Sequence, residues 1–111
     1  MKKGDIVLVQ FPFTNLIGTK LRPALVIAPE NKKGDIILAF ITAQISKKDE
    51  HDLFISSKDP QNGLKKDSII KLQKITTIHK RIVLGKIGEL PPQRLQEVDE
   101  RLIKIFQISI K

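Results

Sequence analysis

The chain has 111 residues, 41% of them apolar, which is the length and balance of one folded domain, so we expect a single domain over residues 1–111. It contains no cysteine, which excludes a disulfide framework and a thiolate metal site and favours a reducing compartment. Its net charge of +8 favours a polyanionic partner such as nucleic acid, although basic charge also serves solubility alone.

The first half of the sequence predicts three strands, with a loop after the first and a turn after the second. Asp5–Phe11 (DIVLVQF) is apolar on both faces, as is typical of a central strand. Pro12 and Pro23 cannot donate ladder hydrogen bonds, and the turn-forming residues between them predict a long loop. Apolar runs at Ala24–Ala28 and Asp35–Thr42 flank the turn sequence PENKKG, so these two segments predict a hairpin.

The second half predicts further strands and then a helix. Leu53–Ile55 alternates as a short edge strand between polar loops, Ser68–Ile78 is a long β-rich run with a bend, and Gly85–Leu90 is a last short strand. After Pro91-Pro92 the apolar residues recur every three or four positions, as in an amphipathic helix: Leu95, Val98, Leu102, Ile105 and Phe106. This order predicts a mainly β fold with α, a small antiparallel β-barrel with a C-terminal amphipathic helix.

Motifs that bind cofactors or metals are absent from the sequence. It has no Gly-rich phosphate loop, no HExxH, no CxxC and no nucleophile elbow. His51 and His79 lack metal-ligand spacing, and we expect both at the surface, with proton transfer as the alternative role. The apolar stretch that follows Met-Lys-Lys-Gly-Asp at the N-terminus is too short for a signal peptide core or a membrane span. We therefore expect no cofactor, no metal, no membrane partner and a cytoplasmic protein.

Two residues at strand ends are candidates for binding phosphate. Pro23 favours an extended conformation for Arg22, and the planar guanidinium suits bidentate contact with a phosphate group. Thr42 ends the neighbouring antiparallel strand, so its hydroxyl can lie near Arg22 at the same barrel rim. Spacing alone also allows a simpler interpretation, in which Arg22 is a solvated strand-end charge and Thr42 an ordinary β-branched strand residue.

Several sequence blocks, in order along nearly the whole chain, resemble one known family. The segments GDIVLVQFPFTNLIGTKLRPALVI and GDIILAFITAQI resemble the opening of MazF/PemK-type toxins, in which a Gly-Asp strand leads through a loop to Arg-Pro and then to Ile-Thr. GLKKDSIIKLQKITTIHK is similar to the family's Gly-x-x-x-Asp-Ser segment, and EVDERLIKIF resembles its terminal helix. The resemblance implies an SH3-like barrel of the CcdB/MazF type that forms a homodimer and cleaves single-stranded RNA as the toxin component of a toxin-antitoxin module.

The resemblance also implies which residues form the site. Arg22 and Thr42 fall on the family's catalytic arginine and threonine, and Ser68 falls on a serine of the active-site region. At the RNA-binding or active-site periphery we expect Phe13, Thr14, Lys20, Gln44, Ser68 and Lys74. Phe13 has a core or dimer position as its alternative. Lys74 and Thr76 stand where many members carry glutamine and arginine, so the RNA sequence that is cleaved does not follow from the resemblance.

The expected mechanism needs no metal, because RNA carries its own nucleophile, the ribose 2′-hydroxyl. We expect a sequence-specific endoribonuclease that leaves a 2′,3′-cyclic phosphate and a 5′-hydroxyl, with the general base unassigned because arginine is a poor base. The expected partners are single-stranded mRNA, a cognate antitoxin protein, a second copy of the chain and, for the toxin-antitoxin complex, DNA.

Two alternatives stay open. One is a non-enzymatic, CcdB-like toxin that binds a protein such as gyrase. The other is a single-strand nucleic-acid-binding barrel, for which the five aromatic residues, all Phe and none spaced as a surface ladder, make a poor stacking platform.

Overall fold

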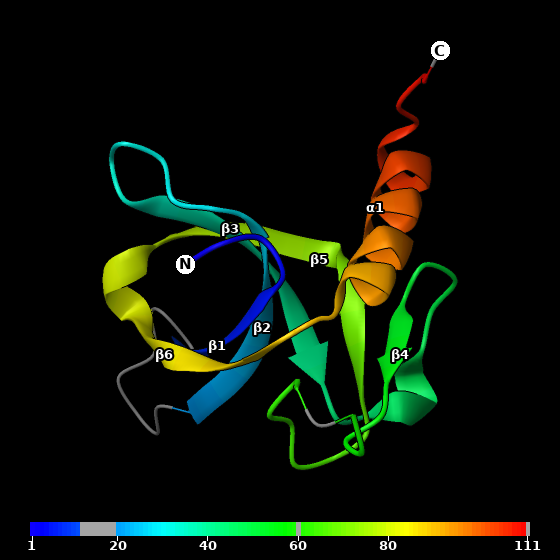
Figure 1. Ribbon diagram of the computed structural model, residues 1–111, viewed down its shortest axis with the longest axis horizontal. Helices are drawn as coiled ribbons and strands as arrows, with labels where there is room; N and C mark the ends of the chain where they lie inside the picture. The colour runs from blue at the N-terminus through cyan, green and yellow to red at the C-terminus, as the bar shows by residue number, and fades with distance from the viewer. Residues whose placement is uncertain (12–19, 60, 111) are drawn as a thin grey trace.

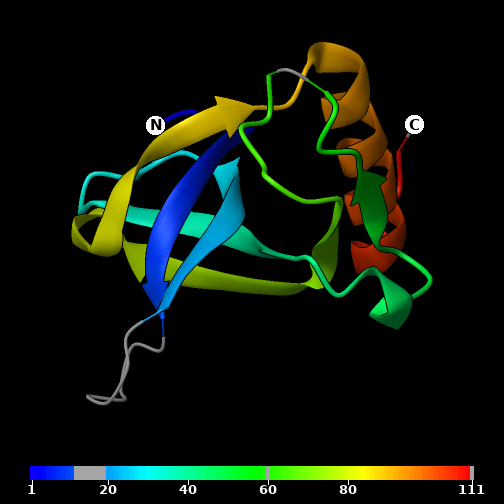
Figure 2. The same ribbon diagram turned by 90° about the horizontal axis from the view of Figure 1, so that it is seen from below.

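The computed structural model describes residues 1–11, 20–59 and 61–110. The strands that it describes form one antiparallel sheet in the order β4-β5-β3-β2-β1-β6, and the sheet curls strongly, with α1 standing beside β4 and β5 at one end (Figures 1 and 2). The expectation of a mainly antiparallel β fold with one C-terminal helix is confirmed. In chain order the elements are β1 (Asp5–Phe11), β2 (Lys20–Ala28), β3 (Asp35–Thr42), the 3-10 helix η1 (Ile45–Lys47), β4 (Leu53–Ile55), β5 (Ser68–His79), the 3-10 helix η2 (Lys80–Ile82), β6 (Val83–Glu89) and α1 (Pro92–Phe106).

The central strands bury both of their faces, in two separate apolar clusters. On β1, Ile6 belongs to the cluster that α1 covers, whereas Val7 and Val9 belong to the cluster that lies within the curl of the sheet. On β2, Leu25 belongs to the first cluster and its neighbour Val26 to the second. This division follows from the alternation of side chains along a strand. It explains why these strands are continuously apolar in the sequence.

The bend predicted in the long strand is confirmed as an irregularity in the pairing of β3 with β5. Ala39 pairs with Ile75, but the next residue, Phe40, pairs with Lys71, so three residues of β5 are passed over. Such extra residues bend a strand and increase its twist. The bend separates the half of β5 that pairs with both β3 and β4 from the half that pairs with β3 alone.

The expected end of the first loop at Pro23 is wrong, because β2 already begins at Lys20. Along this stretch β2 pairs with β1, and Pro23 lies opposite Leu8. The pairing of β2 with β3 begins only at Ala24. At Pro23 the strand therefore has a single neighbour, and proline, which lacks an N–H, is tolerated at such an open strand edge. The last strand also differs from expectation, because it begins at Val83 rather than Gly85.

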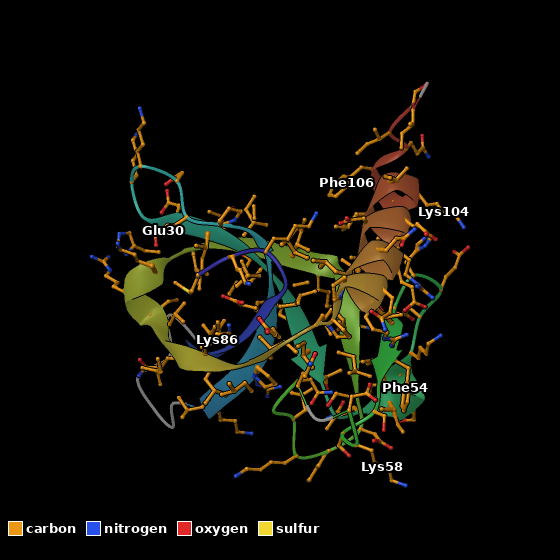
Figure 3. The ribbon with its side chains drawn as sticks, viewed as in Figure 1. Glu30, Phe54, Lys58, Lys86, Lys104 and Phe106 are labelled. Atoms are coloured by element: carbon orange, nitrogen blue, oxygen red, sulfur yellow. The ribbon has the colours of Figure 1, made fainter. Side chains whose placement is uncertain are left out.

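The terminal helix begins as predicted, with Pro91 as its N-cap and Pro92 in its first turn. Val98 and Leu102 are buried against the sheet, but Phe106 is 54% exposed, so its expected place on the buried face is wrong. The last turn of α1 projects past the sheet, as the position of Phe106 in Figure 3 shows, and the side chain there has no strand beneath it. In the described part of the chain, no helix is long and apolar enough to cross a membrane.

Candidate active site

The pairing of β2 with β3 brings the two predicted catalytic residues to the same place. Ala24 lies opposite Phe40, and each step back along β2 is matched by one step forward along β3. Continued by two residues past this last regular pair, the register sets Arg22, the third residue of β2, opposite Thr42, the last residue of β3. The same two residues line two neighbouring pockets.

The first of these, the basic pocket, has a volume of about 670 Å³. Its lining carries five basic side chains and one acidic one, so it is suited to a polyanion. Three uncharged polar residues also face it, namely Thr42, Gln44 and Ser46. The charged residues of the lining are Arg22, Lys47, Lys48, Lys71, Lys74 and Asp49.

The second, the apolar pocket, has a volume of about 380 Å³ and shares Arg22, Ile41 and Thr42 with the first. Most of its other wall is apolar, and Lys65 and Lys66 stand on it as the remaining cations. Arg22 and Thr42 therefore stand where a cationic pocket meets an apolar one. A ligand with a charged backbone and flat apolar groups, such as a single nucleic-acid strand, matches this pair of surfaces.

The polar groups of the Arg22–Thr42 pair are available to a ligand. The backbone N–H of Gln44 donates to Thr42 Oγ1 at 3.1 Å, which fixes the oxygen and leaves the hydroxyl hydrogen to donate elsewhere. Arg22 is exposed, and within the described ranges no carboxylate forms an ion pair with its guanidinium. A phosphate group can therefore accept from both side chains at once.

Ser68 supports the apolar pocket rather than offering a free hydroxyl to it. The residue is buried, and its Oγ donates to the carbonyl oxygen of Lys66 at 2.9 Å. The neighbouring wall is held in a similar way, because the buried Asn62 donates to the Ser56 carbonyl and accepts from the Leu64 backbone N–H. The hydroxyl hydrogen of Ser68 is thus already used by the pocket wall.

The structure places the other predicted site residues unequally. Gln44 and Lys74 line the basic pocket, whereas Lys20 is exposed at the start of β2 and lines neither pocket. Phe13 and Thr14 lie outside the described residues. The four described residues of the periphery therefore divide between the two pockets and the open surface of β2.

Neither histidine lines either pocket. Both are half-buried rather than fully exposed; His79 accepts from the Arg81 backbone N–H through Nδ1 at 3.1 Å, and His51 lies 3.8 Å from a carboxylate oxygen of Glu50. Among the residues that the structure describes, no group of three or more His, Cys, Asp or Glu side chains is placed to hold a metal ion.

Lys71 is a residue of the basic pocket that sequence reasoning missed. It is buried on β5 and forms ion pairs with Asp52 at 2.6 Å and Asp49 at 2.9 Å. Lys71 donates a hydrogen bond to Asp52 and another to Asp49, and these two bonds, in that order of size, raise the pKa of Lys71. The hydrogen bond that Asp49 accepts from Lys71 lowers the pKa of Asp49. A lysine inside the apolar run SIIKL was the available signal, because lysine is rarely buried without a partner.

Comparison with known proteins identifies the family of the chain. A family described as PemK-like, MazF-like toxin of type II toxin-antitoxin system matches residues 2–106. Endoribonuclease EndoA of Bacillus subtilis is 34% identical over 99% of this chain and 94% of its own length. The crystal structure of MazE-MazF from Deinococcus radiodurans has a TM-score of 0.80 at 19% identity, covering 98% of this chain and 97% of that one. A mycobacterial endoribonuclease in complex with its cognate antitoxin has a TM-score of 0.76 at 12% identity, covering 100% and 99%. The chain, a homologue of an endoribonuclease, belongs to the PemK-like, MazF-like toxins of type II toxin-antitoxin systems.

Proposed function

We propose that this chain is an endoribonuclease that cleaves single-stranded RNA at short sequences by attack of the ribose 2′-hydroxyl. The observation that carries the proposal is the convergence of Arg22 and Thr42 where the basic pocket meets the apolar pocket. The identity shared with Endoribonuclease EndoA over almost the whole chain supports it.

In this reaction the enzyme supplies alignment and charge stabilisation, and the substrate supplies the nucleophile. The 2′-oxygen bonds to phosphorus and loses its proton, while the bond from phosphorus to the 5′-oxygen breaks and that oxygen gains a proton. Arg22 binds the non-bridging phosphate oxygens, and the hydroxyl of Thr42 donates to the same phosphate. The products are a 2′,3′-cyclic phosphate on the upstream fragment and a 5′-hydroxyl on the downstream fragment.

The two pockets give the strand a path across the scissile phosphate. The exposed cations of the basic pocket hold the backbone on one side, and the apolar pocket receives a base on the other. Base-paired RNA resists cleavage, because its bases are stacked inside a helix and unable to enter such a pocket.

The active species is a homodimer, and its inhibitor is a cognate antitoxin. Solved complexes of MazE-MazF and of an endoribonuclease with its cognate antitoxin support the antitoxin as partner. An acidic segment of the antitoxin suits the net charge of +8 and the cationic basic pocket, so it competes with RNA for the same surface.

The test uses one RNA oligonucleotide that the protein cleaves and a copy with a single deoxyribose 5′ to the scissile phosphate. The deoxy copy should bind nearly as well, because one hydroxyl adds little to binding through phosphates, but it should not be cut. Mass spectrometry of the products of the all-ribose strand should find the cyclic phosphate and the 5′-hydroxyl, with EDTA present throughout. Cleavage of the deoxy copy, or products with a 5′-phosphate that require Mg²⁺, would contradict the mechanism.

A further inference from the structure

One wall of the basic pocket is a segment that lacks an apolar anchor of its own. Residues 44–49 contribute Gln44, Ser46, Lys47, Lys48 and Asp49 to the pocket, and all of them are exposed. The 3-10 helix η1 at the centre of this segment buries none of its residues. Its backbone hydrogen bonds, such as Lys48 N–H to the Ile45 carbonyl, reach only neighbouring residues. Apolar packing therefore does not explain how the segment keeps its shape.

Lys71 supplies the connection between this segment and the sheet. Its Nζ donates to the Lys47 carbonyl at 3.1 Å, to Asp49 Oδ2 at 2.9 Å and to Asp52 Oδ2 at 2.6 Å. Asp52 is almost fully buried, and its Oδ2 also accepts from the Asp49 backbone N–H at 2.7 Å. A single ammonium group thus holds a backbone carbonyl and two carboxylates of the same loop.

The three hydrogen bonds also exclude Lys71 from direct contact with the ligand. A lysine ammonium has three hydrogens, and these three acceptors use all of them, so none is left for an RNA phosphate. Hydrogen bonds between charged groups in a buried setting are strong and well defined in geometry. Lys71 lines the basic pocket, but it stabilises the pocket wall instead of binding the ligand.

From these contacts we infer that Lys71 is a positioning residue: it holds residues 44–49 in the shape in which their side chains bind RNA. The inference rests on the proposed function for its ligand. On this inference, the affinity for RNA depends on residues 44–49 being held in one conformation, whereas the chemical step depends on Arg22 and Thr42.

The main variant is the double substitution Lys71→Met with Asp52→Asn. Methionine keeps the length of the side chain, and asparagine can still accept from the Asp49 N–H. The two substitutions together leave no unpaired buried charge and do not change the net charge. We expect the dissociation constant of the deoxy-blocked RNA, and KM for the all-ribose RNA, to rise about tenfold, the value of one charge-assisted hydrogen bond. We expect kcat to fall less than the affinity does, because the Gln44 N–H that fixes Thr42 Oγ1 lies next to β3, away from the groups that Lys71 holds. A general loss of folded protein would instead lower kcat and leave KM unchanged.

Lys86 provides a matched control on another part of the fold. It also pairs with one buried and one half-buried carboxylate, Asp5 at 3.2 Å and Glu89 at 3.2 Å. It lies on β6, however (Figure 3), and lines neither pocket. Lys86→Met with Asp5→Asn removes the same kinds of groups, also without changing the net charge. Its RNA dissociation constant should stay within about twofold of wild type. An equal loss of affinity in both double variants would overturn the inference.

A second measurement does not depend on RNA. Lys47 and Lys48 are exposed trypsin sites inside the segment, and a segment held in place is cut slowly because a protease needs several residues of extended chain. Limited trypsin digestion should cut after Lys47 or Lys48 several-fold faster in Lys71→Met with Asp52→Asn than in wild type or the Lys86 control. An unchanged trypsin rate would overturn the inference. If wild-type protein neither binds nor cleaves RNA, the proposed function is wrong, and the trypsin rates alone then decide whether Lys71 holds the segment in place.

Asp49→Asn tests the same idea in a variant that keeps the buried Lys71–Asp52 pair. Asp49 is largely exposed, so the fold should tolerate the change. Charge alone predicts tighter RNA binding, because the substitution removes the one acidic side chain of the basic pocket. Positioning by Lys71 predicts no gain in affinity and a trypsin rate between those of wild type and the double variant. A several-fold gain in affinity at an unchanged trypsin rate would overturn the inference.

Discussion

Arg22 and Thr42 lie opposite each other when the register of β2 and β3 is continued past its last regular pair, and both side chains line both pockets. They are twenty positions apart in the sequence, but the hairpin brings them together without any contribution from the terminal helix. Arg22 lies on a part of β2 that pairs with β1, and Thr42 lies on a part of β3 that pairs with β5, so two neighbouring strands give these phosphate-directed groups a rigid support.

Arg22→Ala should lower kcat for RNA cleavage by about a hundredfold or more, because it removes a preorganised donor that stabilises charge on the phosphate. The fold should persist, since Arg22 is exposed and is not part of either apolar cluster. Single-turnover cleavage with circular dichroism on the same samples measures both effects. Arg22→Lys keeps the charge but not the planar fork, so it should recover only part of the rate. A folded Arg22→Ala variant with near wild-type kcat would remove Arg22 from the mechanism.

Thr42→Val replaces the hydroxyl by a methyl group in a side chain of the same shape. The loss of a hydrogen bond to a charged phosphate, worth about 1.5–3 kcal/mol, should slow cleavage by roughly ten- to a hundredfold. Thr42→Ser keeps the hydroxyl and should retain most of the rate. Equal rates for the valine and serine variants would show that the hydroxyl takes no part.

Gly63→Ala should strongly destabilise the protein, whereas Gly85→Ala should not. Gly63 has φ +70°, and an added Cβ would lie 2.0 Å from the carbonyl oxygen of Ile87, while nothing lies within 4 Å of a Cβ at Gly85. The left-handed conformation alone costs about 1–2 kcal/mol for a residue with a side chain, and the contact with a backbone oxygen adds to this. Urea denaturation of both variants compares the free energies of unfolding. Similar midpoints for the two alanine variants would contradict the close approach of Gly63 to β6.

Local pattern was sufficient for some parts of the fold and site but not for others. The strands β1 and β3 were predicted with their observed bounds, because apolar runs and turn residues are local signals. The meeting of Arg22 with Thr42 followed from the same hairpin. The contacts of Lys71 could not be predicted from the sequence, because they join residues 19 to 24 positions apart through a bulged strand and an irregular loop. The start of β2 was missed because tolerance of Pro23 depends on which neighbours flank it.

Arg94→Met should loosen the attachment of α1 to the edge strand β4. The guanidinium of Arg94 donates to the Phe54 carbonyl and forms an ion pair with Glu97 at 2.6 Å. Losing a charged donor to a carbonyl costs about 1–3 kcal/mol, which urea denaturation resolves. Lys104→Met removes a charge from an exposed position of the same helix and should leave the midpoint unchanged. If the two variants unfold at the same midpoint as wild type, Arg94 does not hold α1 to β4.

The stability of the protein should fall in acid, in part through Asp67. The backbone N–H of Ser57 and then its hydroxyl donate to Asp67 Oδ1, and these bonds hold the pKa of Asp67 below its ordinary 3.8. Because the folded pKa is the lower one, the stabilisation is present above about pH 3.8 and is lost as the pH falls through the folded pKa. In thermal melts from about pH 6 down to pH 3, the melting temperature of wild type should therefore exceed that of Asp67→Asn at the higher pH. The difference between the two melting temperatures should narrow as the pH falls. Ser57→Ala removes only the hydroxyl and should show a smaller difference that narrows over the same range. Melting temperatures of wild type and Asp67→Asn that stay a constant distance apart from pH 6 to pH 3 would mean that this carboxylate does not contribute through its charge.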